Sequence, residues 1–211
     1  DPHYPQLVPS PWDKMYKAED MEIPDFSFAE HEKNPPYFKE VFKKVPKLAE
    51  YKESGQGVHG LHRHIFNKKK QQKKLAYAYG MVSFMDKYIG KILEQVKQLG
   101  LEDNTIIVFT CDHGDLFGQH GFVHKCMFHH EDSLRVPMIV KYKNVIPEGQ
   151  RSNSLQSLID IAPTLMDLCN LNITQSMSGV NQSEVWKDAK KNKRDYIICE
   201  NRHEPHVMHI V

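Results

Sequence analysis

Two side chains that could bind a cation follow a short apolar run near the middle of the chain. Residues 106–109 are Ile-Ile-Val-Phe, and Asp112, His113 and Gly114 come soon after them. A buried strand of a parallel sheet commonly ends in this way, with polar side chains at the sheet edge where ligands bind. Asp112 offers an anionic oxygen and His113 a nitrogen, and Gly114 permits the sharp turn that would let both reach one cation. The pattern predicts a metal site to which these two residues contribute part of the ligand set.

Two further side chains could handle an anion. Lys125 follows on the same loop, and its ammonium could hold an anionic oxygen and stabilise a leaving oxygen as an ester bond breaks. A lone lysine can equally be plain surface charge. His3 could donate a hydrogen bond to the bridging oxygen or act as a general acid, because an imidazole titrates near neutral pH. With Lys125 and His3 added, the sequence predicts a metal ion and an anion in one site.

The same stretch resembles a known family. The segment DHGDLFGQHG at 112–121, then Lys125, then EDSLRVP at 131–137 is similar to the second half of the catalytic domain of the sulfatase family, within the alkaline phosphatase superfamily. DPHYP at 1–5, the segment 81–90 and DIAPTL at 160–165 resemble further parts of that domain in the same order. The resemblance implies an α/β fold, an alkaline phosphatase-like layered sheet with helices on both faces. Residues 1–211 are expected to be an incomplete fragment, the C-terminal part of that domain.

The resemblance also implies roles for the candidate residues. Asp112 and His113 match the later pair of the family's metal ligands, Lys125 its active-site lysine, and His3 its substrate-contacting histidine. The family's usual ion is Ca²⁺, although a histidine ligand would also suit Mg²⁺, Mn²⁺ or Zn²⁺. His120 resembles a regular member of the family's segment and is expected to brace the loop.

One part of the family's machinery is absent from these residues. Sulfatases carry a C/S-x-P/A-x-R segment whose first residue is oxidised to formylglycine, the nucleophile, and no such segment follows the cysteines at 111, 126, 169 and 199. We therefore expect the formylglycine and the remaining metal ligands in a part that precedes residue 1. The fragment alone is expected to be inactive.

These features predict a sulfuric ester hydrolase that acts on a sulfated small molecule or, more specifically, a sulfated carbohydrate. One alternative is a phosphodiesterase or phosphonate monoester hydrolase of the same superfamily, and another is a non-catalytic binding or assembly module. A periplasmic or extracellular location is implied by the resemblance alone, since no signal region is visible. The oligomeric state stays open.

The composition excludes some other classes. With 28 basic and 27 acidic residues the formal charge is +1, so no overall charge favours nucleic acid or an anionic membrane. No stretch approaches the roughly 20 apolar residues that span a bilayer. Local basic runs at 68–74 and 190–194, and histidines at 59, 62 and 64, could contact a polyanion, but such groups are more often solvated surface.

Elements that would position the site can be assigned from periodicity and turn residues. Residues 1–65 are rich in proline and aromatic residues, which predicts a long irregular surface segment with short helical turns near 38–51. This segment either lines the site or packs against the rest of the domain without a ligand role. Residues 70–211 predict an α/β core. It contains a helix at 71–100 ended by Gly100, strands at 105–111 and 136–142, a helix at about 159–169 capped by Asp160, and a last strand at 196–200.

Overall fold

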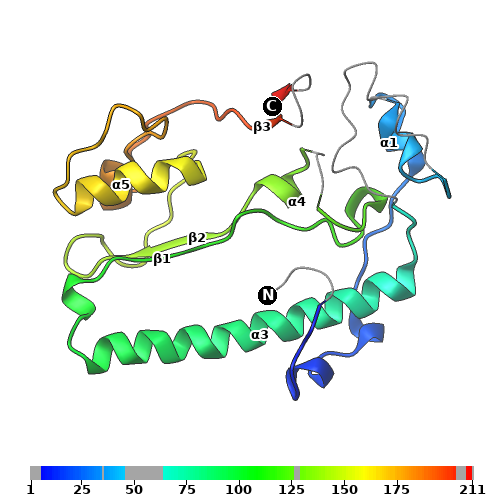
Figure 1. Ribbon diagram of the computed structural model, residues 1–211, viewed down its shortest axis with the longest axis horizontal. Coiled ribbons are helices and arrows are strands. Elements are labelled where there is room, and N and C mark those ends of the chain that lie inside the picture. The colour runs from blue at the N-terminus through cyan, green and yellow to red at the C-terminus, as the bar shows by residue number, and fades with distance from the viewer. Residues whose placement is uncertain (1–5, 35, 46–63, 126–128, 203–207, 211) are drawn as a thin grey trace. The chain divides into compact units, whose positions relative to one another are not determined.

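The structure is a computed structural model that describes residues 6–34, 36–45, 64–125, 129–202 and 208–210 (Figure 1). The chain divides into two compact units, and each is described by itself. The first contains Asp1–Gln95, His113–Arg135 and Glu200–His209, and the second contains Val96–Asp112, Val136–Cys199 and Ile210–Val211.

The described residues contain both helices and strands. The α-helices are α1 (Tyr37–Glu40), α3 (Lys68–Gln98), α4 (Glu131–Leu134), α5 (Ile161–Leu168) and α6 (Ser183–Lys187). The strands are β1 (Ile107–Thr110), β2 (Met138–Lys141), β3 (Glu200–Arg202) and β4 (Met208–Ile210). Short 3₁₀ helices occur at Trp12–Lys14, Ala18–Asp20, Phe28–His31, Glu102–Asn104, Gln119–Gly121 and Leu158–Asp160. The predicted strand at 196–200 is wrong for residues 196–199, which are not part of a strand, and β3 begins only at Glu200. An apolar run forms a strand only where another strand pairs with it.

The long helix α3 has clear start and stop signals in the sequence. Asn67 Oδ1 accepts a hydrogen bond from the Lys70 amide at 3.0 Å, which satisfies one of the free N–H groups of the first turn. At the other end Gly100 has a φ of +68°, and the Leu101 amide donates to the Val96 carbonyl at 3.1 Å. This is the hydrogen bond of a helix that ends in a left-handed glycine. The predicted helix and its end at Gly100 are confirmed.

The buried face of α3 differs from its most apolar stripe. Several apolar residues at helical spacing are largely exposed: Tyr79 at 47%, Val82 at 56% and Leu93 at 41%. The buried positions are instead Gln71, Ala76, Gly80 and Met81. A Cβ on Gly80 would lie 2.3 Å from the Trp12 carbonyl oxygen, so only glycine lets the N-terminal segment approach this closely. The close approach at Gly80, rather than the most apolar stripe, decides which face of α3 packs.

Strands β1 and β2 form an antiparallel pair (Figure 1), with Ile107 opposite Lys141 and Thr110 opposite Met138. The prediction of a buried parallel strand is therefore wrong for the described part of the chain, where Phe109 on β1 is 42% exposed. An apolar β-branched run predicts a strand, but its partner and direction depend on contacts distant in sequence. Asp112 follows two residues after the end of β1.

The core of the first unit is built around Phe122, whose side chain is fully buried. The rings of Phe42, His31 and His64 have centroids 5.2, 5.1 and 5.1 Å from that of Phe122. His64 Nδ1 accepts a hydrogen bond from the Val123 amide at 3.1 Å. The surface interpretation of His64 is therefore wrong, because this histidine fills the core as an aromatic ring with a polar partner. Residues 59 and 62 lie outside the described residues.

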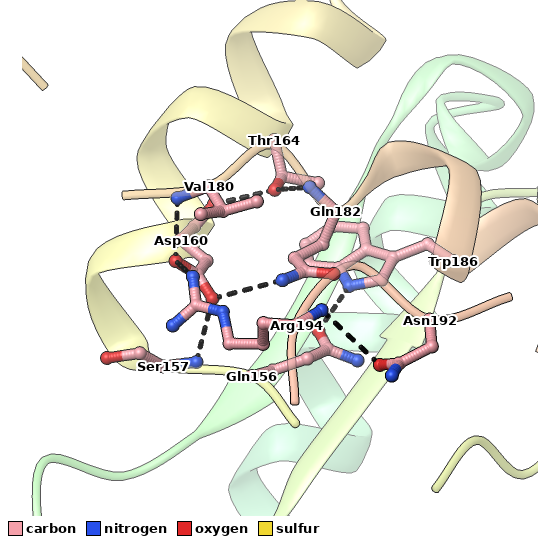
Figure 2. Close-up of polar contacts among 9 residues, drawn as sticks. All are labelled: Gln156, Ser157, Asp160, Thr164, Val180, Gln182, Trp186, Asn192 and Arg194. Carbon is pink, nitrogen blue, oxygen red and sulfur yellow. Dashed lines mark hydrogen bonds and ion pairs between the residues drawn. The ribbon is translucent and has the colours of Figure 1, made fainter. Parts of the chain in front are cut away.

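The second unit has a polar centre at Asp160, which lies at the start of α5 (Figure 2). The Asp160 side chain is buried, and its carboxylate accepts hydrogen bonds from the amides of Ser157 and Val180 at 2.8 Å each, from Gln182 Nε2 at 3.3 Å and from Arg194 Nη2 at 2.7 Å. Asp160 occupies the N-cap position of α5, as predicted. Its carboxylate, however, bonds the Ser157 amide in a capping box of the preceding 3₁₀ helix and forms no side-chain cap of α5.

The segments around Asp160 converge at close range. Thr164 Oγ1 donates to the Asp160 carbonyl at 2.6 Å and accepts from the Gln182 amide at 2.8 Å. A Cβ on Gly179 would lie 2.0 Å from the Ile159 carbonyl oxygen. Because the Asp160 side chain is 2% exposed and that of Arg194 16%, the two charges compensate each other away from most solvent.

Among the described residues, no helix combines the length and the apolar character needed to cross a bilayer.

Replacing Asp160 with Asn should destabilise the second unit strongly. The variant keeps the size of the side chain but leaves the buried guanidinium of Arg194 without its counter-charge, which costs about 3 kcal/mol or more. Urea unfolding followed by Trp186 fluorescence, in a Trp12→Phe background, measures the loss. Asp195→Asn, an exposed carboxylate nearby, is the control and should change stability by less than about 0.5 kcal/mol. Equal effects of the two substitutions would contradict a central role for Asp160.

Candidate functional site

The structure brings two of the predicted site residues into direct contact. Lys125 Nζ lies 2.9 Å from His113 Nε2, although the two residues are twelve positions apart. His113 Nδ1 lies 2.8 Å from the Gly114 carbonyl oxygen, which can only accept, so Nδ1 carries the proton and donates. Nε2 is then the unprotonated nitrogen and accepts from the Lys125 ammonium.

The position of the proton on the His113 ring decides whether His113 can bind a metal ion. Histidine binds metals through an unprotonated ring nitrogen while the other nitrogen donates to a carbonyl or carboxylate, and His113 has this arrangement. Its Nε2 already faces a cation, the Lys125 ammonium. The chemistry of His113 therefore fits a metal ligand. No group of three or more histidine, cysteine or acidic side chains in the described part of the chain is placed to hold a metal. Asp112 as a second ligand stays a prediction.

Gly114 is required for a reason that differs from the predicted one. A Cβ on Gly114 would lie 1.8 Å from the Asp132 carbonyl oxygen, and the Gly114 amide donates to the Ser133 carbonyl at 2.9 Å. Gly114 does not have a positive φ. The glycine therefore serves close approach of two backbones rather than an unusual turn, and it fixes the start of the loop against α4.

Asp115 and Lys74 add a partly buried pair of opposite charges beside these residues. Burial raises the pKa of Asp115, while a hydrogen bond from the Phe117 amide and the charges of Lys74 and Lys125 act in the opposite direction. Burial also lowers the pKa of Lys74, against the influence of Asp115. A carboxylate next to His113 thus reduces the repulsion between Lys125 and any cation bound nearby.

A second polar cluster lies in the same unit, centred on His120. His120 Nδ1 donates to Glu30 Oε2 at 2.8 Å, and His120 Nε2 lies 3.6 Å from Asp132 Oδ2. The His120 ring stacks on His130, with centroids 4.0 Å apart and an angle of 16° between the planes. His124, His129 and His130 on the same loop are half-buried. His130 in particular packs inside the unit against Phe122.

Other predicted features lie elsewhere. His3 and Cys126 are outside the described residues. Cys111 and Cys199 are half-buried and Cys169 is exposed. A pocket of about 620 Å³ is present, but its lining contains none of the predicted residues: Gln6, Leu7, Val8, Pro9, Asp13, Tyr77 and Phe84.

The sequence did not indicate several of these participants. Asp115 is the last residue of the DHGD motif, and its place in that motif was the sequence signal for a role near His113. Lys74 falls in a basic run that resembles solvated surface. Asp132 stands inside the EDSLRVP segment, but nothing in the sequence connects it or Glu30 with His120, because these contacts span 12 and 90 positions and exist only in the folded chain.

Comparison with known proteins identifies relatives over most of the chain. A family model described as Sulfatase matches residues 1–171. An arylsulfatase of Clostridium perfringens is 28% identical over 206 residues, which cover 95% of this chain and 38% of that protein. The chain thus spans less than half the length of the arylsulfatase it matches.

Solved structures show the same similarity. The phosphonate monoester hydrolase from Silicibacter pomeroyi has a TM-score of 0.75 at 22% identity, over 94% of this chain and 38% of its own. A protein solved in complex with its substrate D-glucosamine-2-N,6-O-disulfate has a TM-score of 0.60 at 26% identity, over 77% of this chain and 33% of its own. The predicted fold class, α/β and alkaline phosphatase-like, is confirmed.

Replacing Gly114 with Ala should disrupt the loop that carries His113. The added methyl group would overlap the Asp132 carbonyl oxygen, so the two backbones must separate, and we expect a loss of about 2 kcal/mol or more in unfolding free energy. The matched control is Gly90→Ala in α3, where a Cβ meets nothing within 4 Å. That control should raise stability by about 0.5–1 kcal/mol. Urea unfolding of both variants measures the difference, and a neutral Gly114→Ala would contradict the close approach.

The pH dependence of stability should report His130. Burial, followed by the neighbouring His120 and His31, lowers the pKa of His130 from 6.5 to about 4. The unfolded chain then binds a proton between about pH 4 and pH 6.5 that the folded chain does not, so stability falls as the pH is lowered through this window. His130→Gln should reduce proton uptake on unfolding by up to one proton. Urea titrations from pH 4.5 to pH 7.5 test this, and an unchanged pH slope in the variant would exclude His130 as the source.

Proposed function

We propose that this chain, which belongs to the sulfatase family, is part of a sulfuric ester hydrolase that acts on a sulfated carbohydrate. The observation that carries the proposal is the contact between Lys125 Nζ and His113 Nε2 at 2.9 Å. It joins a side chain suited to an anion and a side chain suited to a metal ion, as hydrolysis of an anionic ester requires. In this proposal residues 1–211 are one part of a single catalytic domain.

Asp112 and His113 would hold a divalent metal ion, most suitably Ca²⁺, with Mg²⁺, Mn²⁺ or Zn²⁺ as further possibilities. When bound, such an ion supplies positive charge that polarises the ester group. Lys125 would bind a sulfate oxygen through its ammonium and offset negative charge as the ester bond breaks. His3 would donate a hydrogen bond or a proton to the bridging oxygen as the alcohol leaves.

The nucleophile of this reaction would come from outside the 211 residues. The C/S-x-P/A-x-R segment does not occur in them. We therefore place the formylglycine and the other metal ligands in a further part of the protein, and we expect no turnover by the 211 residues alone.

Support for a carbohydrate comes from a relative. The solved protein that resembles this chain at 26% identity binds D-glucosamine-2-N,6-O-disulfate, a sulfated amino sugar, as its substrate. A saccharide with sulfate groups is accordingly the substrate class we propose. A periplasmic or extracellular location is the corresponding proposal for where such a substrate is met.

Replacing Lys125 with Met should lower kcat/KM for a sulfate ester by about 100- to 1,000-fold in the full-length protein, since one group that stabilises developing charge is lost. Lys69→Met, an exposed lysine of α3, is the control and should leave turnover unchanged. The measurement is release of an aryl alcohol from its sulfate ester. An equal effect of both substitutions would show that Lys125 acts only as surface charge.

The same assay separates this function from its alternatives. The full-length protein should hydrolyse sulfate monoesters faster than phosphate diesters or phosphonate monoesters of the same alcohol. The reverse order would establish a phosphodiesterase or phosphonate monoester hydrolase. Absence of turnover on all three, with bound metal and an intact fold, would indicate a binding or assembly module.

A further inference from the structure

We propose that His120 is a positioning residue for the loop that carries His113 and Lys125. Its imidazole joins Glu30 to Asp132, and Asp132 in turn holds the start of that loop through Gly114. The inference rests on the proposed function, in which this loop is part of a catalytic site. The connection between His120 and the loop rests on contacts within the first unit.

The imidazole of His120 lies between two carboxylates. Its Nδ1 donates to Glu30 Oε2 at 2.8 Å, and its Nε2 is 3.6 Å from Asp132 Oδ2. The side chains of these residues are only 33–34% exposed, so the surrounding protein limits screening by solvent. His120 thereby connects the 3₁₀ helix Phe28–His31 to α4.

The ring of His120 is fixed in orientation by its neighbours. One face stacks on His130 with a centroid distance of 4.0 Å. The carbonyl oxygen of His120 lies 2.9 Å from Nε2 of the fully buried His31, which donates to it. Asn34 Nδ2 lies 3.2 Å from His31 Nδ1 and can donate to that nitrogen, which agrees with a proton on Nε2. The ring therefore has little freedom to leave the two carboxylates.

The backbone at His120 is held in a conformation that side chains rarely adopt. Its φ is +55°, which costs about 1–2 kcal/mol for a residue other than glycine. A Cβ on the adjacent Gly121 would lie 2.5 Å from the Phe26 ring, so close packing enforces the turn. Histidine tolerates this region better than most residues, and the contacts of its ring with Glu30 and His130 offset part of the cost.

The path to the site runs through Asp132. The side chain of Asp132 faces His120, while its carbonyl oxygen is the atom against which Gly114 packs. The Gly114 amide also donates to the carbonyl of Ser133, the next residue of α4. A displacement of Asp132 would therefore move Gly114 and, with it, the neighbouring His113.

The lowered pKa of Glu30 agrees with this arrangement. Burial alone would raise the pKa of Glu30, but its hydrogen bond with His120 outweighs that effect and lowers it. His130 has a pKa of about 4 and is neutral. The groups that face the imidazole are the carboxyl groups of Glu30 and Asp132, with His31 and His130 nearby.

The test compares Glu30→Gln, His120→Gln and the double variant of the full-length protein. Amide hydrogen exchange of Gly114 is the main measurement, because Gly114 contacts neither mutated side chain in the described structure. We expect exchange at Gly114 to be about 10-fold faster in each single variant. The double variant should show no further increase, because each substitution breaks the same connection from Glu30 through His120 to Asp132. Glu32→Gln, an exposed carboxylate two residues from Glu30, is the matched control and should leave exchange unchanged.

The second measurement is turnover of a sulfate ester, for which we expect kcat to fall about 10-fold or more with a smaller change in KM, because small misplacement of a reacting group is costly. If the His120→Gln variant does not fold, hydrogen exchange and turnover of the Glu30→Gln variant alone test the inference. Unchanged exchange at Gly114 would overturn the inference, and so would faster exchange with an unchanged kcat. Hydrogen exchange does not depend on turnover, so failure of the proposed function, seen as an inactive wild-type protein, is distinguishable from failure of this connection.

Discussion

The close approach of Gly114 to the backbone of α4 is the constraint on which the candidate site depends. It leaves no room for a methyl group between the two segments and fixes His113 next to the first turn of α4. Lys125 can then meet His113 Nε2 only if the intervening loop folds back, and the left-handed residues 117, 118, 120 and 121 produce that reversal. The site is thus defined by backbone contacts first and by side-chain chemistry second.

Two histidines form part of the buried core of the first unit. His31 and His64 are fully buried beside Phe122, where each supplies an aromatic face to the core and a ring nitrogen to a backbone group. A phenylalanine would give the same packing but would leave the His120 carbonyl or the Val123 amide without a partner, at a cost of about 1–3 kcal/mol. These histidines therefore link the aromatic core to the loop that carries the site.

The sequence was informative where the signal is local. Gly100 ends α3 as predicted, and the apolar runs locate β1 and β2. The DHGD motif with its later lysine assigned His113 and Lys125 to one predicted site, and the two side chains are in contact. The sequence was uninformative where the cause is a distant contact. The packed face of α3 follows from the Trp12 backbone beside Gly80, the antiparallel direction of β1 from its partner, and the role of Glu30 from a residue 90 positions away. Periodicity and propensity describe single segments and contain no information about which segments meet.

The polar centre at Asp160 has a consequence for variation between relatives. Ser157, Val180, Gln182 and Arg194 all donate to one carboxylate, so the chain between them forms closed loops whose ends are fixed independently of their lengths. Lengthening such a loop adds only closure entropy, about 0.6 kcal/mol for each doubling of its length. Residues 171–178 and 187–193 can therefore accept insertions of new sequence while the four donors and α5 keep their places, which allows the surface of the second unit to diversify without a change of fold.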